Sequence, residues 1–328
     1  MIYTLTPNPS IDTTLVLNTT LARGEVQRLD HSESVAGGKG VNVALALHKA
    51  GSAATAIFPA RPQDPFVQLV ADTKLPYEAV HAGENPQRVR VNTAVTEPDG
   101  TTTKLNDKGA EVTTELQTAI ENTVVAAAPQ ADWLVLAGSL PPGVPVDWYA
   151  TLVRLAKQAN PQLRVAVDTS DAPLVNLCIA VHAGDASNAP HLVKPNGMEL
   201  GQVVGVDGTR LEDEAAKGNF EPTLEAARKL LQRGIESALV TLGGAGALYV
   251  TADHAWHATP PPAKIQSTVG AGDCTLAGFI LAQQHCLDEA ASLQQAVAYG
   301  TAAASLPGTT IPEPGQVNIA GTAVRSID

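Results

Sequence analysis

The sequence predicts an α/β protein with a mainly parallel sheet covered by helices on both faces and a small inserted β-sheet lid. The main observation is the alternation of short, continuously apolar segments with helical segments. The chain has 328 residues, of which 44% are hydrophobic, enough for one large domain. No fixed-period repeat or low-complexity linker interrupts it, so we expect one domain over residues 1–328.

The main elements follow one another along the chain. The first strand covers residues 1–6, and a helix over 40–51 ends at Gly51. Runs rich in β-branched residues predict strands, and longer periodic runs predict helices, one of them ending at Gly234. The further strands are expected at 54–60, 133–138, 164–170, 191–196, 237–244 and 246–252. The further helices are expected at 66–75, 114–128, 146–159 and 223–234, followed by two at the C-terminal end.

Two segments, at about 12–36 and 86–106, break the alternation because they contain short strands with polar faces. In the second, Asp99-Gly100 is a turn signal and predicts a hairpin. Period-two alternation separates two faces. One carries Val89, Val91, Thr93 and Val95, and the other carries Arg88, Arg90, Asn92 and Ala94. The arginine face is either a solvated surface or the inner side of a lid over a cleft.

Composition excludes several classes of function. The formal net charge of −12 argues against a nucleic-acid partner or an anionic membrane surface. The three cysteines lack metal-ligand spacing, and no apolar run reaches the roughly 20 residues of a membrane span. The N-terminal residues do not resemble a signal peptide, so we expect a soluble, cytoplasmic protein.

The stretch QSTVGAGDCTLAGFILA, which begins at Gln266, places Gly270, Ala271 and Gly272 directly before Asp273 at a helix start. One interpretation is an acidic residue that complements the helix dipole. The other is an anion site in which backbone N–H groups hold a negative charge. Asp273 would repel an anion there unless it has a proton to accept, and this stretch alone favours neither interpretation.

A second glycine cluster, AGGKG, places Lys39 at the start of the helix over 40–51. The cluster has neither the Walker spacing nor the dinucleotide fingerprint. A cation at a helix N-terminus is unfavourable by several tenths of a kcal/mol without an anionic partner. We therefore expect a second anion site at Lys39, with Asn42 one turn further along the helix.

Six motifs occur in order along the chain: TLTPNPSID, AGGKGVNVALAL, AGSLPPGVP, VKPNGMEL, VTLGGAGAL and STVGAGDCTLAGF. Together they resemble the ribokinase-like carbohydrate kinases of the phosphofructokinase B family, from Ile2 to about Pro312. Within the family the motifs are most similar to those of 1-phosphofructokinases and tagatose-6-phosphate kinases.

The resemblance implies roles for matching positions. Asp273 is the implied general base, and the backbone N–H groups of Gly270, Ala271, Gly272 and Asp273 stabilise the transferred phosphoryl group. The implied sugar-phosphate ligands are Asp12, Gly38, Lys39, Asn42, Arg90 and Ser139, with Arg28 assisting. The implied ATP ligands are Lys194, Thr241, Gly243, Gly246, Gly300 and Ala303. Asn196 and Glu199 are the implied pair that organises Mg²⁺; an exposed helix acid is the alternative for Glu199.

The implied activity is ATP-dependent phosphorylation of a ketose phosphate, with fructose 1-phosphate as the first expectation. Tagatose 6-phosphate and fructose 6-phosphate remain open, as do an uncharged substrate and a non-catalytic sugar-phosphate sensor. An NAD-linked oxidoreductase is disfavoured because its glycine fingerprint is missing. The resemblance also implies dimerisation through the lid sheet, although the valines of this sheet could equally pack on the chain's own core.

Two features depart from the family pattern. Cys274 replaces a residue that is often serine, which makes thiol reactivity possible. The segment 182–191 is longer and more polar than a compact strand-to-strand link, and the sequence offers no account of it.

Overall fold

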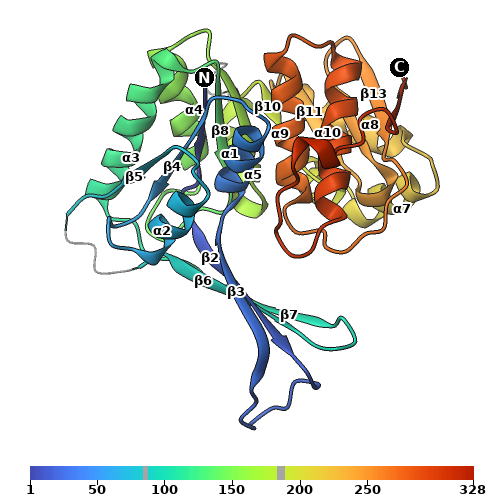
Figure 1. The fold of residues 1–328 in the computed structure, drawn as a ribbon. Coiled ribbons are helices and arrows are strands. Elements are labelled where there is room, and N and C mark those ends of the chain that lie inside the picture. The colour runs from blue at the N-terminus through green and yellow to red at the C-terminus, as the bar shows by residue number, and fades with distance from the viewer. Residues whose placement is uncertain (84–87, 183–188) are drawn as a thin grey trace.

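Residues 1–83, 88–182 and 189–328 are described by a computed structural model of the chain. Most of the segment 182–191 therefore lies outside the described residues, as does part of the expected lid range 86–106. Ten strands of the described residues form one sheet, and four more form a second, smaller sheet. Figure 1 shows the small sheet extending away from the body that the main sheet and its helices make.

The centre of the main sheet is parallel, as the alternating sequence predicts. Its strand order is β14-β13-β12-β11-β10-β9-β8-β1-β4-β5. The parallel strands are β1 (Ile2–Leu5), β4 (Ala54–Pro59), β5 (Tyr77–Val80), β8 (Trp133–Ala137), β9 (Arg164–Asp168), β10 (Leu192–Val193) and β11 (Ser237–Thr241). An antiparallel edge follows, made of β12 (Ala247–Val250), β13 (Ala255–Thr259) and β14 (Ala323–Ser326).

Helices cover both faces of this sheet, because side chains of a strand alternate between its faces. In β8, Leu134 and Leu136 belong to one hydrophobic core, whereas Trp133 and Val135 belong to the other. The first core is covered by α3 (Thr114–Ala127), α4 (Trp148–Ala159), α5 (Asp171–His182), α6 (Gly197–Val204), α7 (Gly208–Ala216) and α8 (Glu221–Leu231). The second is covered by α1 (Lys39–Lys49), α2 (Pro65–Asp72), α9 (Ala271–Gln284) and α10 (Glu289–Ala304).

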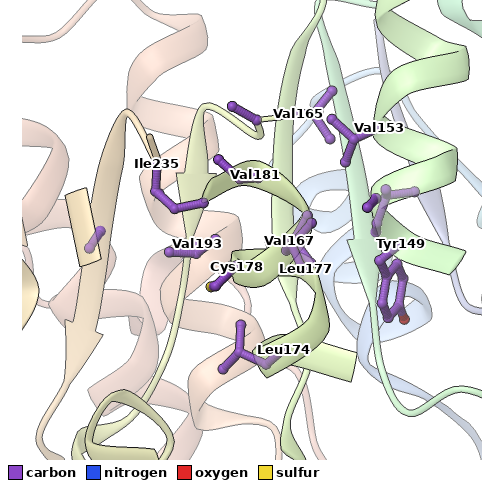
Figure 2. Close-up of a cluster of buried hydrophobic side chains, with 14 of the residues drawn as sticks. Tyr149, Val153, Val165, Val167, Leu174, Leu177, Cys178, Val181, Val193 and Ile235 are labelled. Atoms are coloured by element: carbon purple, nitrogen blue, oxygen red, sulfur yellow. The ribbon is translucent and has the colours of Figure 1, made fainter. Parts of the chain in front are cut away.

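Helix α5 was not predicted, and its packing shows why. Figure 2 shows its side chains Leu174, Leu177, Cys178 and Val181 beside the buried valines of β9. Apolar residues cover α5 with little helical periodicity, so its sequence lacks the one-sided pattern that identifies an amphipathic helix. Helix α7 and strands β5, β13 and β14 were also missed, α6 was expected only as the helical turn that carries Glu199, and β10 contains only two of the six residues expected for it.

The lid sheet has the order β3-β2-β6-β7. Its strands are β2 (Ser10–Leu17), β3 (Leu29–Gly37), β6 (Arg90–Thr96) and β7 (Thr102–Leu105). Strands β6 and β7 pair antiparallel around Asp99-Gly100, as predicted. Val89, just before β6, is buried in the chain's own second core, and Val95 is also buried. In the described residues, no helix is long and apolar enough to cross a membrane.

Asp64 joins helix α2 to the start of the lid. Its carboxylate accepts a hydrogen bond from Phe66 N at 3.0 Å, which caps α2, and one from Val89 N at 2.9 Å. Asp64 is 3% exposed, so both N–H groups depend on it where little water can replace it. Asp207 caps α7 in the same way but is exposed.

We predict that Asp64→Ala lowers the free energy of unfolding by about 2–4 kcal/mol, since it removes a cap and leaves a buried lid N–H without a partner. The matched variant Asp207→Ala removes only an exposed cap and should cost about 1 kcal/mol. Urea unfolding of both variants measures the difference. Equal losses would show that the bond to Val89 N contributes nothing.

Candidate active site

The expected site residues meet at the carboxyl ends of the parallel strands, where open α/β sheets bind their ligands. Asp168 is the last residue of β9, and Lys194 directly follows β10. Ser139 lies just beyond β8, and Thr241 ends β11. Two helix N-termini also reach this edge: α1 begins at Lys39, and α9 begins at Ala271.

Asp273 lies in the first turn of α9 and is only 6% exposed. Its carboxylate accepts a hydrogen bond from Asn42 Nδ2 at 2.7 Å, which brings the two helix starts together. Burial and the nearby negative charge of Asp168 raise the pKa of Asp273 to about 6, against the opposing effect of Lys39. Asp273 can therefore exchange a proton near neutral pH.

In the first turn of α9, Ala271 N donates to Thr268 O at 3.4 Å, whereas the N–H groups of Gly272 and Asp273 have no hydrogen-bond partner among the described residues. Gly270 caps the helix with a φ of 78°, and no side chain caps it. Ala271 and Gly272 line a cleft on the C-terminal side of the molecule. A Cβ on Gly272 would lie 3.2 Å from Lys194 Nζ, so the lysine lies directly beside this turn. The arrangement has the two parts of an anion site, helix N–H groups and a cation.

Asp168 is a functional candidate that the sequence did not reveal. It is completely buried, and each of its carboxylate oxygens approaches a different lysine. Lys39 Nζ lies 2.7 Å from Oδ1, and Lys194 Nζ lies 3.0 Å from Oδ2. Burial opposes ionisation, but the two lysines hold the pKa of Asp168 below its ordinary value. No local pattern marks this residue, since it ends an apolar strand.

This ion pair corrects the argument made from the sequence for Lys39. The cation at the start of α1 has an anionic partner within the chain, so the helix dipole alone does not require an external anion. The side chain of Lys39 is nevertheless 35% exposed, whereas that of Lys194 is 5% exposed. Burial lowers the pKa of Lys39, but Asp168 and Asp273 raise it above its ordinary value, so Lys39 stays charged.

Asp12 is fixed at the base of the lid. Its Oδ1 accepts hydrogen bonds from Ser10 Oγ at 2.7 Å and from Asn92 Nδ2 at 3.0 Å. A Cβ on Gly37 would collide with this carboxylate, so the neighbouring strand β3 needs glycine at that position. Asp12 and Asn92 thus lie together on the face of the lid sheet predicted to be polar.

Arg90 joins the lid to the main sheet. Its guanidinium donates to Asp107 O at 2.9 Å, to Asn8 O at 3.1 Å and to Ser139 Oγ at 3.4 Å. Its Nε is buried and has no hydrogen-bond partner among the described residues. Asn8, which the sequence did not single out, donates to Lys108 O and Ser139 Oγ. These contacts fasten the segment after β7 across the strand ends.

A cleft of about 530 Å³ lies next to the first turn of α9. Its lining includes Thr241, Gly243 and Gly246, three of the residues expected to contact a nucleotide. Gly246 has a φ of 93°, and a Cβ there would collide with Ala258 O, so only glycine fits. Gly300 also lines the cleft, and its contact with Thr275 leaves no room for a side chain.

Ala303 was expected in this wall but is buried in the second core. The cleft is instead lined by Thr301 and Ala304, which flank it on α10. Ala304 follows Gly300 by four residues and Thr301 by three, so the side of α10 that lines the cleft is the one that carries these three residues.

Asn196 and Glu199 form a capping box at the start of α6. Asn196 Oδ1 accepts from Glu199 N at 2.7 Å, and Glu199 Oε2 accepts from Asn196 N at 2.9 Å. The Asn-x-x-Glu spacing could have predicted this box. It leaves Glu199 Oε1 without a hydrogen-bond partner among the described residues, and the side chain is only partly buried.

The donor set here suits Mg²⁺, which prefers oxygen ligands and keeps several waters. In the described parts of the chain, no three His, Cys, Asp or Glu side chains are grouped to hold a metal ion. A cation at this place would therefore depend on Glu199, water and a bound polyphosphate, and not on a preformed protein cage.

The structure does not support two expectations from the sequence: Arg28 as a ligand of this site and Cys274 as a reactive thiol. Arg28 is exposed and directly precedes β3. The β3 residue that pairs with Asp12 is Val35, seven residues after Arg28, which corresponds to about 23 Å along an extended strand. Arg28 is therefore not brought to this site within one chain. Cys274 is completely buried, and burial together with Asp273 raises the pKa of its thiol, which disfavours the reactive thiolate.

The geometry can be compared with known proteins. Residues 6–315, which are most of the chain, match the pfkB family of carbohydrate kinases. The chain belongs to this family. The expected ribokinase-like fold is also confirmed: phosphofructokinase-2 from Escherichia coli, solved in complex with substrates and products, has a TM-score of 0.81 and 29% identity to this kinase over 96% of each chain.

Curated relatives cover nearly the whole pfkB kinase. The 1-phosphofructokinase of Rhodobacter capsulatus is 35% identical over 95% of this chain and 93% of its own length. That of Haloferax volcanii is 33% identical over 95% of this chain and 94% of its own. The ATP-dependent 6-phosphofructokinase isozyme 2 of Escherichia coli is 33% identical over 93% and 91%.

Proposed function

We propose that this pfkB kinase transfers the γ-phosphoryl group of ATP to a ketose phosphate, with fructose 1-phosphate as substrate and fructose 1,6-bisphosphate as product. The observation that carries the proposal is the charge arrangement around Asp273. Asp273, a proton acceptor with a pKa near 6, lies in a helix start that Lys194 borders, and Asp168 pairs this lysine with the partly exposed Lys39. The 1-phosphofructokinase relatives favour this ketose phosphate.

Asp273 acts as the general base in this proposal. Its carboxylate accepts the proton of the attacking sugar hydroxyl, while Asn42 holds its orientation. The backbone N–H groups of Gly272 and Asp273 face the negative charge on the transferred group. Lys194, beside this turn, neutralises phosphate oxygens of the nucleotide.

Lys39 and Arg90 hold the phosphate already present on the sugar. Lys39 offers a partly exposed ammonium group, and Arg90 offers a buried Nε that has no partner among the described residues. Asp12 and Asn92 contact sugar hydroxyls from the lid. Neither of the two cations would be needed for an uncharged sugar, so they support a phosphorylated substrate.

Asn196 and Glu199 would hold Mg²⁺ together with water and the nucleotide, and the ion would neutralise charge on the β- and γ-phosphates. Glu199 retains one carboxylate oxygen outside the capping box for this role. Asn196 contributes by fixing the backbone and orientation of Glu199.

Fructose 6-phosphate is the second candidate, since the Escherichia coli 6-phosphofructokinase isozyme 2 is as similar as some of the 1-phosphofructokinases. Tagatose 6-phosphate is a third. An ADP-release assay across fructose 1-phosphate, fructose 6-phosphate, tagatose 6-phosphate and free fructose tests the choice. Preference for free fructose would contradict the proposed phosphate-binding role.

The lid also supports a homodimer. The lid exposes Val26, Leu29 and Leu105, of which Val26 is 92% exposed, and the exposed Arg28 directly precedes Leu29. A second copy that covers these residues would bury them. Sedimentation of the wild-type chain over a range of concentrations tests this, and a monomer at every concentration would contradict it.

The first functional prediction concerns the base. Asp273→Asn should keep the hydrogen bond to Asn42 after an amide flip but remove the proton acceptor, so kcat should fall by about 10²–10⁴. In the wild type, kcat should decrease as the pH falls below about 6, because protonated Asp273 cannot accept a proton. A variant with near-wild-type turnover would contradict the assignment.

The second prediction concerns the phosphate already on the sugar. Lys39→Ala and Arg90→Ala should each raise the KM for the phosphosugar by roughly one to two decades, because each removes a charge-assisted contact. The KM for ATP should stay within about twofold, and the two effects should couple in a double-mutant cycle. Weaker ATP binding with an unchanged phosphosugar KM would contradict the assignment.

The third prediction separates the two roles of Glu199. Glu199→Gln preserves a capping-box side chain but removes the charge, so it should raise the Mg²⁺ concentration for half-maximal rate without lowering stability. Glu199→Ala should do both, with a loss of about 1 kcal/mol. Phosphosugar binding without nucleotide is the control. If Glu199→Gln left the Mg²⁺ requirement unchanged, Glu199 would be only a cap.

A further inference from the structure

Asp168 connects two lysines that the proposed function assigns to different substrates. Lys39 comes from the start of α1 and Lys194 from the end of β10, and each contacts its own oxygen of the one carboxylate. Both lysines are linked to the first turn of α9: Lys39 shares α1 with Asn42, which donates to Asp273, and Lys194 lies beside Gly272. Asp168 is therefore the direct contact between the sugar side and the nucleotide side.

A purely structural role would explain this arrangement poorly. Burying a carboxylate is costly, and a buried ion pair can often be replaced by apolar residues without loss of stability. Here the carboxylate is fully buried while the Lys39 side chain stays 35% exposed. An ion pair that is open on one side only can hold a cation ready for a second anion.

We propose that Asp168 is a positioning residue that holds Lys39 and Lys194 on its two carboxylate oxygens and thereby couples phosphosugar binding to nucleotide binding. This inference rests on the proposed function. Without Asp168, the flexible Lys39 side chain loses its anchor, and the buried Lys194 loses the partner that stabilises its charge. Both sites then bind their phosphates less well.

The coupling has a direction that can be tested without changing Asp168. If Lys194 is removed, the whole charge of Asp168 acts on Lys39 and draws it away from the sugar phosphate. Phosphosugar binding should then weaken, although Lys194 does not contact that ligand in the proposed arrangement. A site made of two independent halves would show no such effect.

The test begins with Asp168→Asn, which keeps the size of the side chain. Steady-state kinetics should show the KM for fructose 1-phosphate and the KM for ATP both raised, each at least about fivefold. In this variant the fall of kcat on the acidic side of the pH profile should also shift to lower pH. The charged groups that face Asp273 are Asp168, Lys39 and Lys194, and loss of the carboxylate charge makes Asp273 easier to ionise. If Asp168→Asn leaves both KM values and the acidic side of the kcat profile unchanged, the proposal is overturned.

A double-mutant cycle separates positioning from a general loss of structure. If Asp168 acts through Lys39, the effect of Asp168→Asn on the phosphosugar KM should largely disappear in a Lys39→Met background. If Asp168→Asn and Lys39→Met have additive effects on the phosphosugar KM, this inference is contradicted but the proposed function is not. A wild-type phosphosugar KM in Lys39→Met contradicts the proposed phosphate-binding role of Lys39, and this inference with it.

Lys194→Met keeps the proposal testable if Asp168→Asn fails to fold. It should raise the phosphosugar KM at least about fivefold, in addition to its effect on ATP. The matched control is Lys49→Met, on the same helix as Lys39, whose ion pair with Glu313 lies outside the proposed site. It should leave both KM values unchanged. If Lys194→Met leaves the phosphosugar KM unchanged, the proposed coupling is overturned.

Discussion

Four ionisable side chains, Lys39, Lys194, Asp168 and Asp273, share a poorly hydrated space at the carboxyl edge of the sheet. Each charge would be costly there alone, and together they balance when all four are ionised. This balance constrains the architecture, because the residues come from two strand ends and two helix starts that must all converge. It also sets the chemistry: repulsion by Asp168 helps to keep Asp273 able to take up a proton near neutral pH.

The parallel sheet satisfies that constraint because all of its strands end at the same edge. The second core holds both α1 and α9, and its members Val41, Val43 and Cys274 are the direct chain neighbours of Asn42 and Asp273. The lid is less deeply integrated: it is joined to the body through Asp64, Arg90 and Asn8. The lid residues Asp12 and Arg90 are thus positioned mainly by a few hydrogen bonds, whereas Lys39 and Asp273 are positioned by the helices of the core.

Local signals in the sequence predicted the fold class, the two glycine-rich helix starts and the lid hairpin, because alternation, helix ends and Asp-Gly turns are short-range properties. Asp168 could not be predicted in this way, since it ends an ordinary apolar strand and its partner Lys39 lies 129 residues away. The helix dipole argument found Lys39 but assumed an external anion. Ala303 was misplaced by one helix position, and α5 was missed because it lacks a polar face.

Lys194 is joined to Asn196 by a single proline, and this corner is fixed at both ends. Pro195 O accepts a hydrogen bond from Thr241 N at 3.0 Å, while Asn196 begins the capping box of α6. Proline restricts the backbone further by fixing φ. The cation, the carboxylate of Glu199 and the turn below the nucleotide are consequently ordered when the chain folds. Binding of a polyphosphate therefore requires little loss of conformational entropy at this corner, which favours affinity through preorganisation.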